Sequence, residues 1–216
     1  MKFISQKLLS VILVGAALGG TLSACAPLVV GGAVVGALVA TDRRTSGAQL
    51  EDEGIELRAA SRIRDNLGER GHINVNSYNR RVLLTGEVPN AQDKQLVEQI
   101  VTRVDNVQMV VNELAVLGNA SLTQRSSDTL ITGRIRAAMV DTRDLFANAF
   151  KVVTERGTTY LMGRVTQREA DRATEIARST PGVQKVVRIF EIISEDELRD
   201  LLPKPAANET KATPAK

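Results

Sequence analysis

The sequence predicts an α+β fold built from two tandem copies of one small domain. Three observations lead to this prediction: a motif that occurs twice in the same order, β-rich runs around short turn signals, and helix-capping patterns at matching places. Each copy is expected to run helix, strand, strand, helix, strand. This order predicts a three-stranded mixed sheet with two helices on one face.

The repeat consists of three pairs of segments that occur in the same order. They are Ile63-Arg64 with Ile135-Arg136, Leu83–Val88 with Tyr160–Val165, and Asn106–Val111 with Gly182–Val187. The spacing between partners drifts from 72 to 77 to 76 residues. Such drift indicates small insertions in loops, where they are tolerated.

The first half of the second copy predicts a helix and a hairpin. Ser127 or Asp128 can cap a helix that runs to about Val140, because both side chains can accept a hydrogen bond from an unpaired N–H of the first turn. The β-rich runs Val152–Thr154 and Thr159–Val165 surround Glu155-Arg156-Gly157, which is a hairpin signal.

The second half predicts a capped helix and a last strand. Thr166 and Glu169 have the spacing of a capping box, and Ala173, Ile176, Ala177 and Thr180 then share one helix face. Pro181-Gly182 ends this helix, and the last strand follows over Val183–Ile193. In the first copy Asn90 takes the place of the cap and Asn106 the place of the stop; asparagine suits both.

The N-terminus has the pattern of a targeting segment. A short region with Lys2 and Lys7 precedes an apolar run and then Leu22-Ser23-Ala24-Cys25, which resembles the lipobox of bacterial lipoproteins. This resemblance implies cleavage before Cys25, acylation of that cysteine, and, with Ala26 next, sorting to the outer membrane facing the periplasm. The alternatives are a cut by ordinary signal peptidase after Ala26 and an uncleaved anchor.

The predicted organisation follows from these segments. It comprises a signal peptide (1–24), a lipidated tether (25–54), a first domain (55–117), a linker (118–127), a second domain (128–193), and a short helix with a disordered tail (194–216). Within the tether, the Gly-rich run Ala26–Ala40 is expected to lie near the lipid surface; the alternative is an apolar strand packed on the globular part.

The two copies resemble the BON domain. The resemblance rests on the first helix, the turn after an aliphatic strand, the small-residue helix and the final strand, most clearly over Leu161–Ala170. It covers residues 55–193, and Asn106 departs from the pattern where the second copy has Gly182. Two BON copies behind a lipobox resemble an outer-membrane lipoprotein family. This implies binding of anionic phospholipid, support of envelope integrity, and recruitment to division sites.

Few residues are suited to catalysis or metal binding. The chain has one histidine, His72, expected on the surface in the turn after the first helix, and one cysteine, Cys25. These numbers exclude clusters of several histidines or cysteines around a metal ion and disfavour a Cys/His nucleophile pair. We expect no enzyme activity, no cofactor and no metal site, and the net charge of +3 gives no reason to expect nucleic-acid binding.

Charge and helix geometry point to a lipid-contact site in the second copy. Residues 56–117 carry 8 basic and 8 acidic side chains, whereas residues 128–193 carry 11 and 8. On the first helix of the second copy, Leu130, Gly133, Arg134 and Ala137 form one stripe that joins an apolar tip to a cation. We expect Leu130 to enter acyl chains while Arg134 meets a phosphate.

The matching stripe of the first copy is expected to offer no insertion, since it consists of the polar residues Arg58, Ser61, Arg62 and Asp65. In the family that the chain resembles, an aromatic residue stands at the position of Leu130. The alternative is that Leu130 belongs to the core or contacts the first copy.

The leading hypothesis is therefore a lipid-anchored outer-membrane protein that binds anionic phospholipid through its second BON copy. The alternative function is a periplasmic scaffold that binds envelope or division proteins, or peptidoglycan, through the edge of Val183–Ile193 or through the inter-domain groove. The sequence leaves the oligomeric state open.

Overall fold

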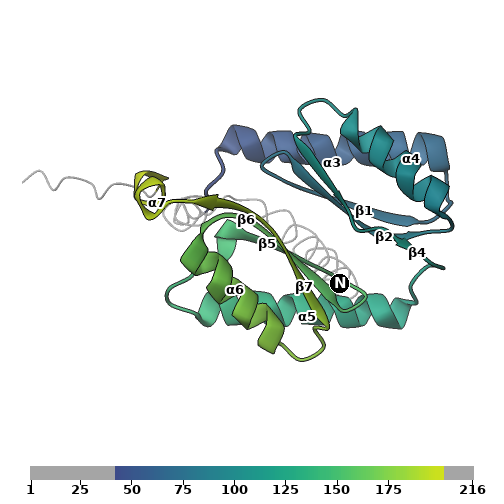
Figure 1. The fold of residues 1–216 in the computed structure, drawn as a ribbon. Helices are drawn as coiled ribbons and strands as arrows, with labels where there is room; N and C mark the ends of the chain where they lie inside the picture. Colours follow the sequence, from purple (N-terminus) through teal and green to yellow (C-terminus); the bar gives the residue numbers. More distant parts are fainter. Residues whose placement is uncertain (1–41, 202–216) are drawn as a thin grey trace, which may run out of the picture. The chain divides into compact units, whose positions relative to one another are not determined.

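The computed structural model describes residues 42–201 of the chain (Figure 1). The predicted signal peptide, Cys25, the Gly-rich run and the tail from residue 202 lie outside the described residues. No helix within residues 42–201 is both long and apolar enough to cross a membrane.

The predicted order of elements is confirmed in both copies. The first copy consists of α3 (Ser46–Leu67), β1 (His72–Tyr78), β2 (Arg81–Val88), α4 (Ala91–Thr102), β3 (Met109–Asn112) and β4 (Ala115–Val116). The second consists of α5 (Leu122–Asp141), the 3₁₀ turn η3 (Ala147–Ala149), β5 (Phe150–Glu155), β6 (Thr158–Thr166), α6 (Gln167–Ser179) and β7 (Lys185–Ile193), followed by α7 (Glu195–Leu201).

Each sheet is mixed, as predicted. The first two strands of each copy pair antiparallel, and the middle strand then pairs in parallel with the last. Two-residue turns join the antiparallel strands, with Asn79-Arg80 in the first copy and Arg156-Gly157 in the second. All four residues have positive φ angles, which is the geometry of the tight hairpin turns that match strand twist.

The last strand of the first copy differs from the prediction because it is split into β3 and β4. Both segments pair in parallel with β2 and keep the same register. Between them, the side chain of Asn112 accepts a hydrogen bond from the N–H of Leu114. Asparagine commonly makes such local bonds, which compete with regular strand pairing.

The predicted caps and stops of the second helices are present. Thr166 and Glu169 form the capping box of α6, and Asn90 caps α4 through the N–H of Asp93. Gly182 and Asn106 have φ angles of 98° and 68°, so both adopt the left-handed conformation expected after a helix.

The first helix of each copy begins earlier than predicted. Ser121, rather than Ser127 or Asp128, caps α5 by accepting the N–H of Gln124. Thr45 caps α3, so that helix begins inside the segment assigned to the tether. The predicted domain boundaries stay predictions, but the linker 118–127 contains the first residues of α5.

The first helices also match one another in a register different from the predicted one. Asp52 in α3 binds the N–H groups of the Asn79-Arg80 turn, and Asp128 in α5 binds those of the Arg156-Gly157 turn. The two aspartates are 76 residues apart, so the pairing of Ile63 with Ile135 is wrong by one helical turn. A shift of four residues keeps the same face buried, which is why the apolar pattern did not reveal the error.

Each copy has its own core between its sheet and two helices, and these helices lie on one face of the sheet in Figure 1. A third cluster joins the other faces of the two sheets. It contains Tyr78 and Leu83 from the first copy and Tyr160, Met162 and Ile189 from the second. The copies therefore bury sheet surface against each other.

A buried ion pair connects the segment before α3 to the second copy. Both nitrogens at the tip of Arg43 bind the carboxylate of Glu169, at 2.6 and 2.7 Å, and Arg43 also donates to the carbonyl of Arg164. The two paired side chains are 3% and 1% exposed. The arginine thus binds the same carboxylate that caps α6.

Candidate membrane-contact surface

The inner face of α5 fixes the orientation of the helix. Ile131, Ile135 and Met139 are buried in the core of the second copy, and Asp128 binds the hairpin turn between β5 and β6. Side chains on the opposite face, about 180° around the helix, consequently point to solvent.

All four residues of the predicted stripe lie on that outer face. Leu130, Gly133, Arg134 and Ala137 are exposed, and Leu130 is 61% exposed. A Cβ atom added at Gly133 would contact nothing within 4 Å, so the helix surface is open at that point. The alternative that Leu130 is a core residue is wrong, because a side chain in the core would be excluded from water.

The apolar stripe is longer than the sequence suggested. Leu122 is 80% exposed and Val140 is 69% exposed, and both lie within about 20° of Gly133 around the helix axis. Sequence reasoning missed Leu122 because it began the helix six residues too late. The Ser121–Gln124 spacing, which is typical of a helix N-terminus, could have revealed the earlier start.

Basic side chains flank this stripe on both sides. Arg134 lies on one side and Arg136 on the other, and both are exposed. Over residues 42–201, neither arginine takes part in a hydrogen bond or ion pair. The acidic residues of α5 are Asp128, which is buried, and Asp141, which is the last residue of the helix.

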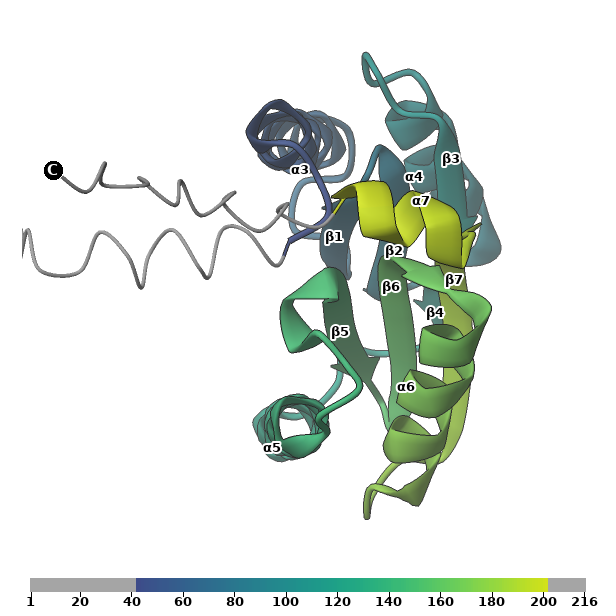
Figure 2. The same ribbon diagram turned by 90° about the vertical axis from the view of Figure 1, so that its left-hand side faces the viewer.

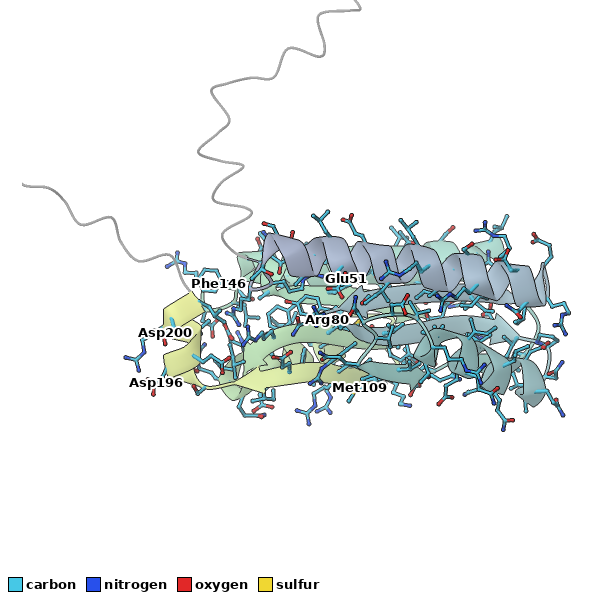
Figure 3. All side chains as sticks on the ribbon, turned by 90° about the horizontal axis from the view of Figure 1, so that it is seen from above. Glu51, Arg80, Met109, Phe146, Asp196 and Asp200 are labelled. Atoms are coloured by element: carbon cyan, nitrogen blue, oxygen red, sulfur yellow. The ribbon has the colours of Figure 1, made fainter. Side chains whose placement is uncertain are left out.

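An aromatic side chain lies beyond the end of α5. Phe146 is 42% exposed, precedes η3, and is found toward the end of the described structure that carries α7 (Figure 3). The guanidinium of Arg43 lies 6.0 Å from its ring centroid. No local sequence pattern predicts this contact, because Phe146 and Arg43 are far apart in the chain.

The corrected register changes which residues of α3 correspond to the stripe. They are Gly54, Leu57, Arg58 and Ser61, rather than Arg58, Ser61, Arg62 and Asp65. Arg58, the true counterpart of Arg134, binds Glu51 at 2.6 Å. The first copy therefore has an exposed leucine at Leu57, but its arginine is paired with a carboxylate.

His72 is in a different place from the one predicted. It is the first residue of β1 and is half-buried, instead of lying on the surface of a turn. Burial and the nearby charge of Arg125 lower the pKa of His72. Over residues 42–201 no group of three or more His, Cys, Asp or Glu side chains could hold a metal ion.

Comparison with protein families identifies the repeated unit. The BON domain model matches residues 52–118 and again residues 127–193, which together make up more than half of the chain. The chain belongs to the BON-domain family. The two αββαβ copies are thus BON domains in tandem, as the resemblance implied.

Two relatives match most of the chain. One is named "Outer membrane lipoprotein DolP", from Haemophilus influenzae; it is 37% identical over 82% of this chain and 93% of its own length. The other is named "21 kDa hemolysin", from Actinobacillus pleuropneumoniae; it is 31% identical over 70% of this chain and 79% of its own length.

Among solved structures, the C-terminal domain of CdsD, a structural protein of the type III secretion system of Chlamydia trachomatis, matches 66% of this chain and 67% of its own. The identity is 12% and the TM-score is 0.27, values at which the likeness supports no conclusion.

Proposed function

We propose that this protein is a lipoprotein of the outer membrane, anchored through Cys25 and facing the periplasm, whose α5 binds anionic phospholipid. The observation that carries the proposal is the exposed apolar stripe of α5 between two unpaired arginines. In this role the protein supports envelope integrity at division sites. It does so without enzymatic activity, by binding.

The proposed contact uses the two kinds of side chain on α5 differently. Leu130, Leu122 and Val140 enter the boundary between headgroups and acyl chains, where each fully buried side chain contributes roughly 1.5–3 kcal/mol. Arg134 and Arg136 bind lipid phosphates through charge-assisted hydrogen bonds. Such a helix lies in the plane of the membrane surface and does not cross it.

The anchor and the helix act together in this proposal. The acyl chains of the diacylglycerol at Cys25 hold the protein at the membrane durably, because each buried methylene contributes about 0.8 kcal/mol. The lipobox-like sequence before Cys25 and the name of the Haemophilus influenzae relative both support the anchor. The helix then adds a contact that depends on the lipid headgroup.

The test of the helix is Leu130→Glu in a chain that lacks residues 1–39, because the described residues 42–201 belong to one compact unit. Losing a buried leucine contact and adding repulsion should weaken binding to vesicles of phosphatidylglycerol and phosphatidylethanolamine by about 2 kcal/mol, roughly thirtyfold. The melting temperature should stay unchanged, because Leu130 is exposed. Vesicle flotation and thermal unfolding measure the two effects.

The matched control is Leu50→Glu, since Leu50 is an exposed leucine of α3, 69% accessible. It should leave flotation unchanged. Equal losses from Leu50→Glu and Leu130→Glu would show that binding is spread over both domains and would overturn the special role of α5.

The test of the anchor is Cys25→Ser in the full chain. Without the thiol no diacylglycerol can be attached, so the variant should take up no labelled fatty acid in cells and should leave the membrane fraction. Fatty-acid labelling of the variant at the level of the unchanged protein would contradict acylation at Cys25.

A further inference from the structure

A groove lies between the two BON domains, away from the outer face of α5. Its volume is about 680 Å³; α3 contributes Glu53, Glu56 and Leu57, and the two strands β1 and β5 contribute Ile73–Asn76 and Val153–Glu155. In Figure 2 the helices α3 and α5 lie above and below β1 and β5 on the same side. A smaller hollow of about 310 Å³ shares Asn74 and Val153–Glu155 and continues toward α5.

Two sheet edges form the floor of this groove. Among the strands that the structure describes, β1 pairs with β2 alone and β5 with β6 alone, so each is an edge strand there. On β1, the N–H of Ser77 points outward and binds Glu56 at 2.7 Å, and its carbonyl accepts from Lys151. Backbone direction alternates along an antiparallel strand, so the N–H and C=O groups of Ile73 and Val75 also point outward.

The same reasoning applies to β5. The closing pair of its two-residue turn, Glu155 with Thr158, is a hydrogen-bonded pair, so the backbone groups of Val152 and Thr154 face away from β6. Within the described residues, no hydrogen bond from another segment reaches the outward backbone groups of Ile73, Val75, Val152 or Thr154. Open edges of this kind are templates for a further strand.

The groove is acidic as well as open. Glu53, Glu56 and Glu155 line it, and within residues 42–201 Glu56 is the one of the three that forms an ion pair, with Lys151. Burial raises the pKa of Glu155, and repulsion from Glu87 adds to this effect, while a hydrogen bond from Asn74 and the charge of Arg125 oppose it. A cationic ligand would relieve that repulsion.

Apolar surface accompanies the carboxylates. On the wall formed by α3, Leu57 is 73% exposed, so a large apolar side chain faces water there. The groove thus presents open strand edges, carboxylates and an apolar side chain. A ligand that matches these three features has free backbone groups, positive charge and alternating apolar side chains.

We propose that this groove binds an extended, lysine- or arginine-bearing peptide segment of another protein, which adds as a strand to the open edge of β1. Backbone hydrogen bonds to Ile73 and Val75 hold the segment, and its apolar side chains contact Leu57. Its cationic side chains meet Glu53 and Glu155. The site is separate from the lipid-contact stripe, so one molecule can hold a membrane and a protein strand at the same time.

The experiment titrates the full-length protein in non-ionic detergent with a fluorescein-labelled peptide of about eight alternating lysines and valines, followed by fluorescence anisotropy. Two matched peptides serve as probes of mechanism. One has glutamate in place of lysine, and the other has N-methyl groups on alternate backbone amides, which removes strand pairing but keeps the charge. Both should bind at least about tenfold more weakly than the lysine–valine peptide.

Variants of the groove complete the test. Glu53→Gln combined with Glu155→Gln should lower the affinity about tenfold, whereas Glu175→Gln, on the exposed surface of α6, should leave it unchanged. Val75→Pro removes an outward N–H that β2 does not use, and should abolish binding. Leu57→Lys, on the exposed wall of the groove, is a second variant that tests the same site if the proline variant folds poorly.

Three outcomes would overturn the proposal. They are equal binding of the lysine and glutamate peptides, equal binding of the N-methylated peptide, and a loss with Glu175→Gln as large as that with the double variant.

Discussion

The helices α3 and α5 have the same inner face and different outer faces. Ile55 and Ala59 of α3 occupy the core positions that Ile131 and Ile135 occupy in α5. Each helix also uses one buried aspartate to bind its hairpin turn. The fold therefore constrains only the inner face, and the outer face is free to change after duplication.

The outer faces differ most in charge. Three glutamates of α3, Glu51, Glu53 and Glu56, correspond to uncharged Ser127, Thr129 and Thr132 of α5. A carboxylate-rich helix repels an anionic membrane, while an unpaired arginine attracts it. The difference agrees with the two contacts that we propose, namely anionic lipid at α5 and a cationic strand beside α3.

The largest expected effect concerns the ion pairs that hold the second helices. Arg43 pairs with Glu169 out of contact with water, whereas Arg70, which pairs with Asp93 in the first domain, is 54% exposed. Arg43→Ala leaves a buried carboxylate unpaired and should cost about 3 kcal/mol of unfolding free energy or more. Arg70→Ala should cost less than about 1 kcal/mol.

Urea unfolding of residues 40–216 compares the two variants. If Arg43→Ala and Arg70→Ala lowered the free energy of unfolding by similar amounts, burial of the Arg43–Glu169 pair would not increase its contribution to stability.

A somewhat smaller effect is expected at the turn-binding aspartates. Burial alone would raise the pKa of Asp52, but hydrogen bonds from Ser77, Arg80 and Arg44 outweigh it and lower the pKa. A lowered pKa means that the carboxylate stabilises the fold above its unfolded pKa, and that this contribution is lost as the pH falls through the folded pKa.

Asp52→Asn should therefore cost about 2 kcal/mol near neutral pH and progressively less as the pH falls through the folded pKa. Unfolding curves at several pH values measure this. A cost that does not change with pH would show that the charge of Asp52 contributes nothing.

Arg134 of α5 and its counterpart Arg58 of α3 allow the outer faces of the two helices to be compared directly. Arg134→Glu should weaken vesicle binding several-fold, and more strongly at low salt, because part of the attraction acts over about one Debye length. Arg58→Glu should change it little, since Arg58 is already paired with Glu51. Flotation at two salt concentrations tests this, and equal effects would refute the difference between the helices.

The smallest expected effect is at Glu155. Burial, followed by the charge of Glu87, raises its pKa above the unfolded value. Its protonated form therefore favours the folded state, and that stability is lost as the pH rises through the folded pKa. Glu155→Gln should stabilise the protein at pH 7, by less than about 1 kcal/mol because the side chain is only half-buried. Thermal unfolding at pH 4 and pH 7 should show the gain only at the higher pH.

Local signals in the sequence were enough to determine the order of elements. The Thr166–Glu169 box, the glycine after Pro181 and the hairpin around Arg156 each act within a few residues, so their geometry is set by neighbouring atoms. The repetition of these signals then predicted two copies of one small domain, and the resemblance of these copies to the BON domain supplied the family. Helix periodicity also predicted the exposed stripe around Leu130, but it did not predict that the stripe extends to Leu122 and Val140.

Contacts between distant residues were decided only by the tertiary structure. The register of α3 against α5 depends on which aspartate reaches which turn, and helix periodicity alone tolerates a shift of one turn. The pairing of Arg43 with Glu169 joins residues 126 positions apart, and no local pattern specifies it. The groove likewise exists only because the other faces of the two sheets pack together. Such packing depends on the shapes of both surfaces at once, which a single strand pattern does not contain.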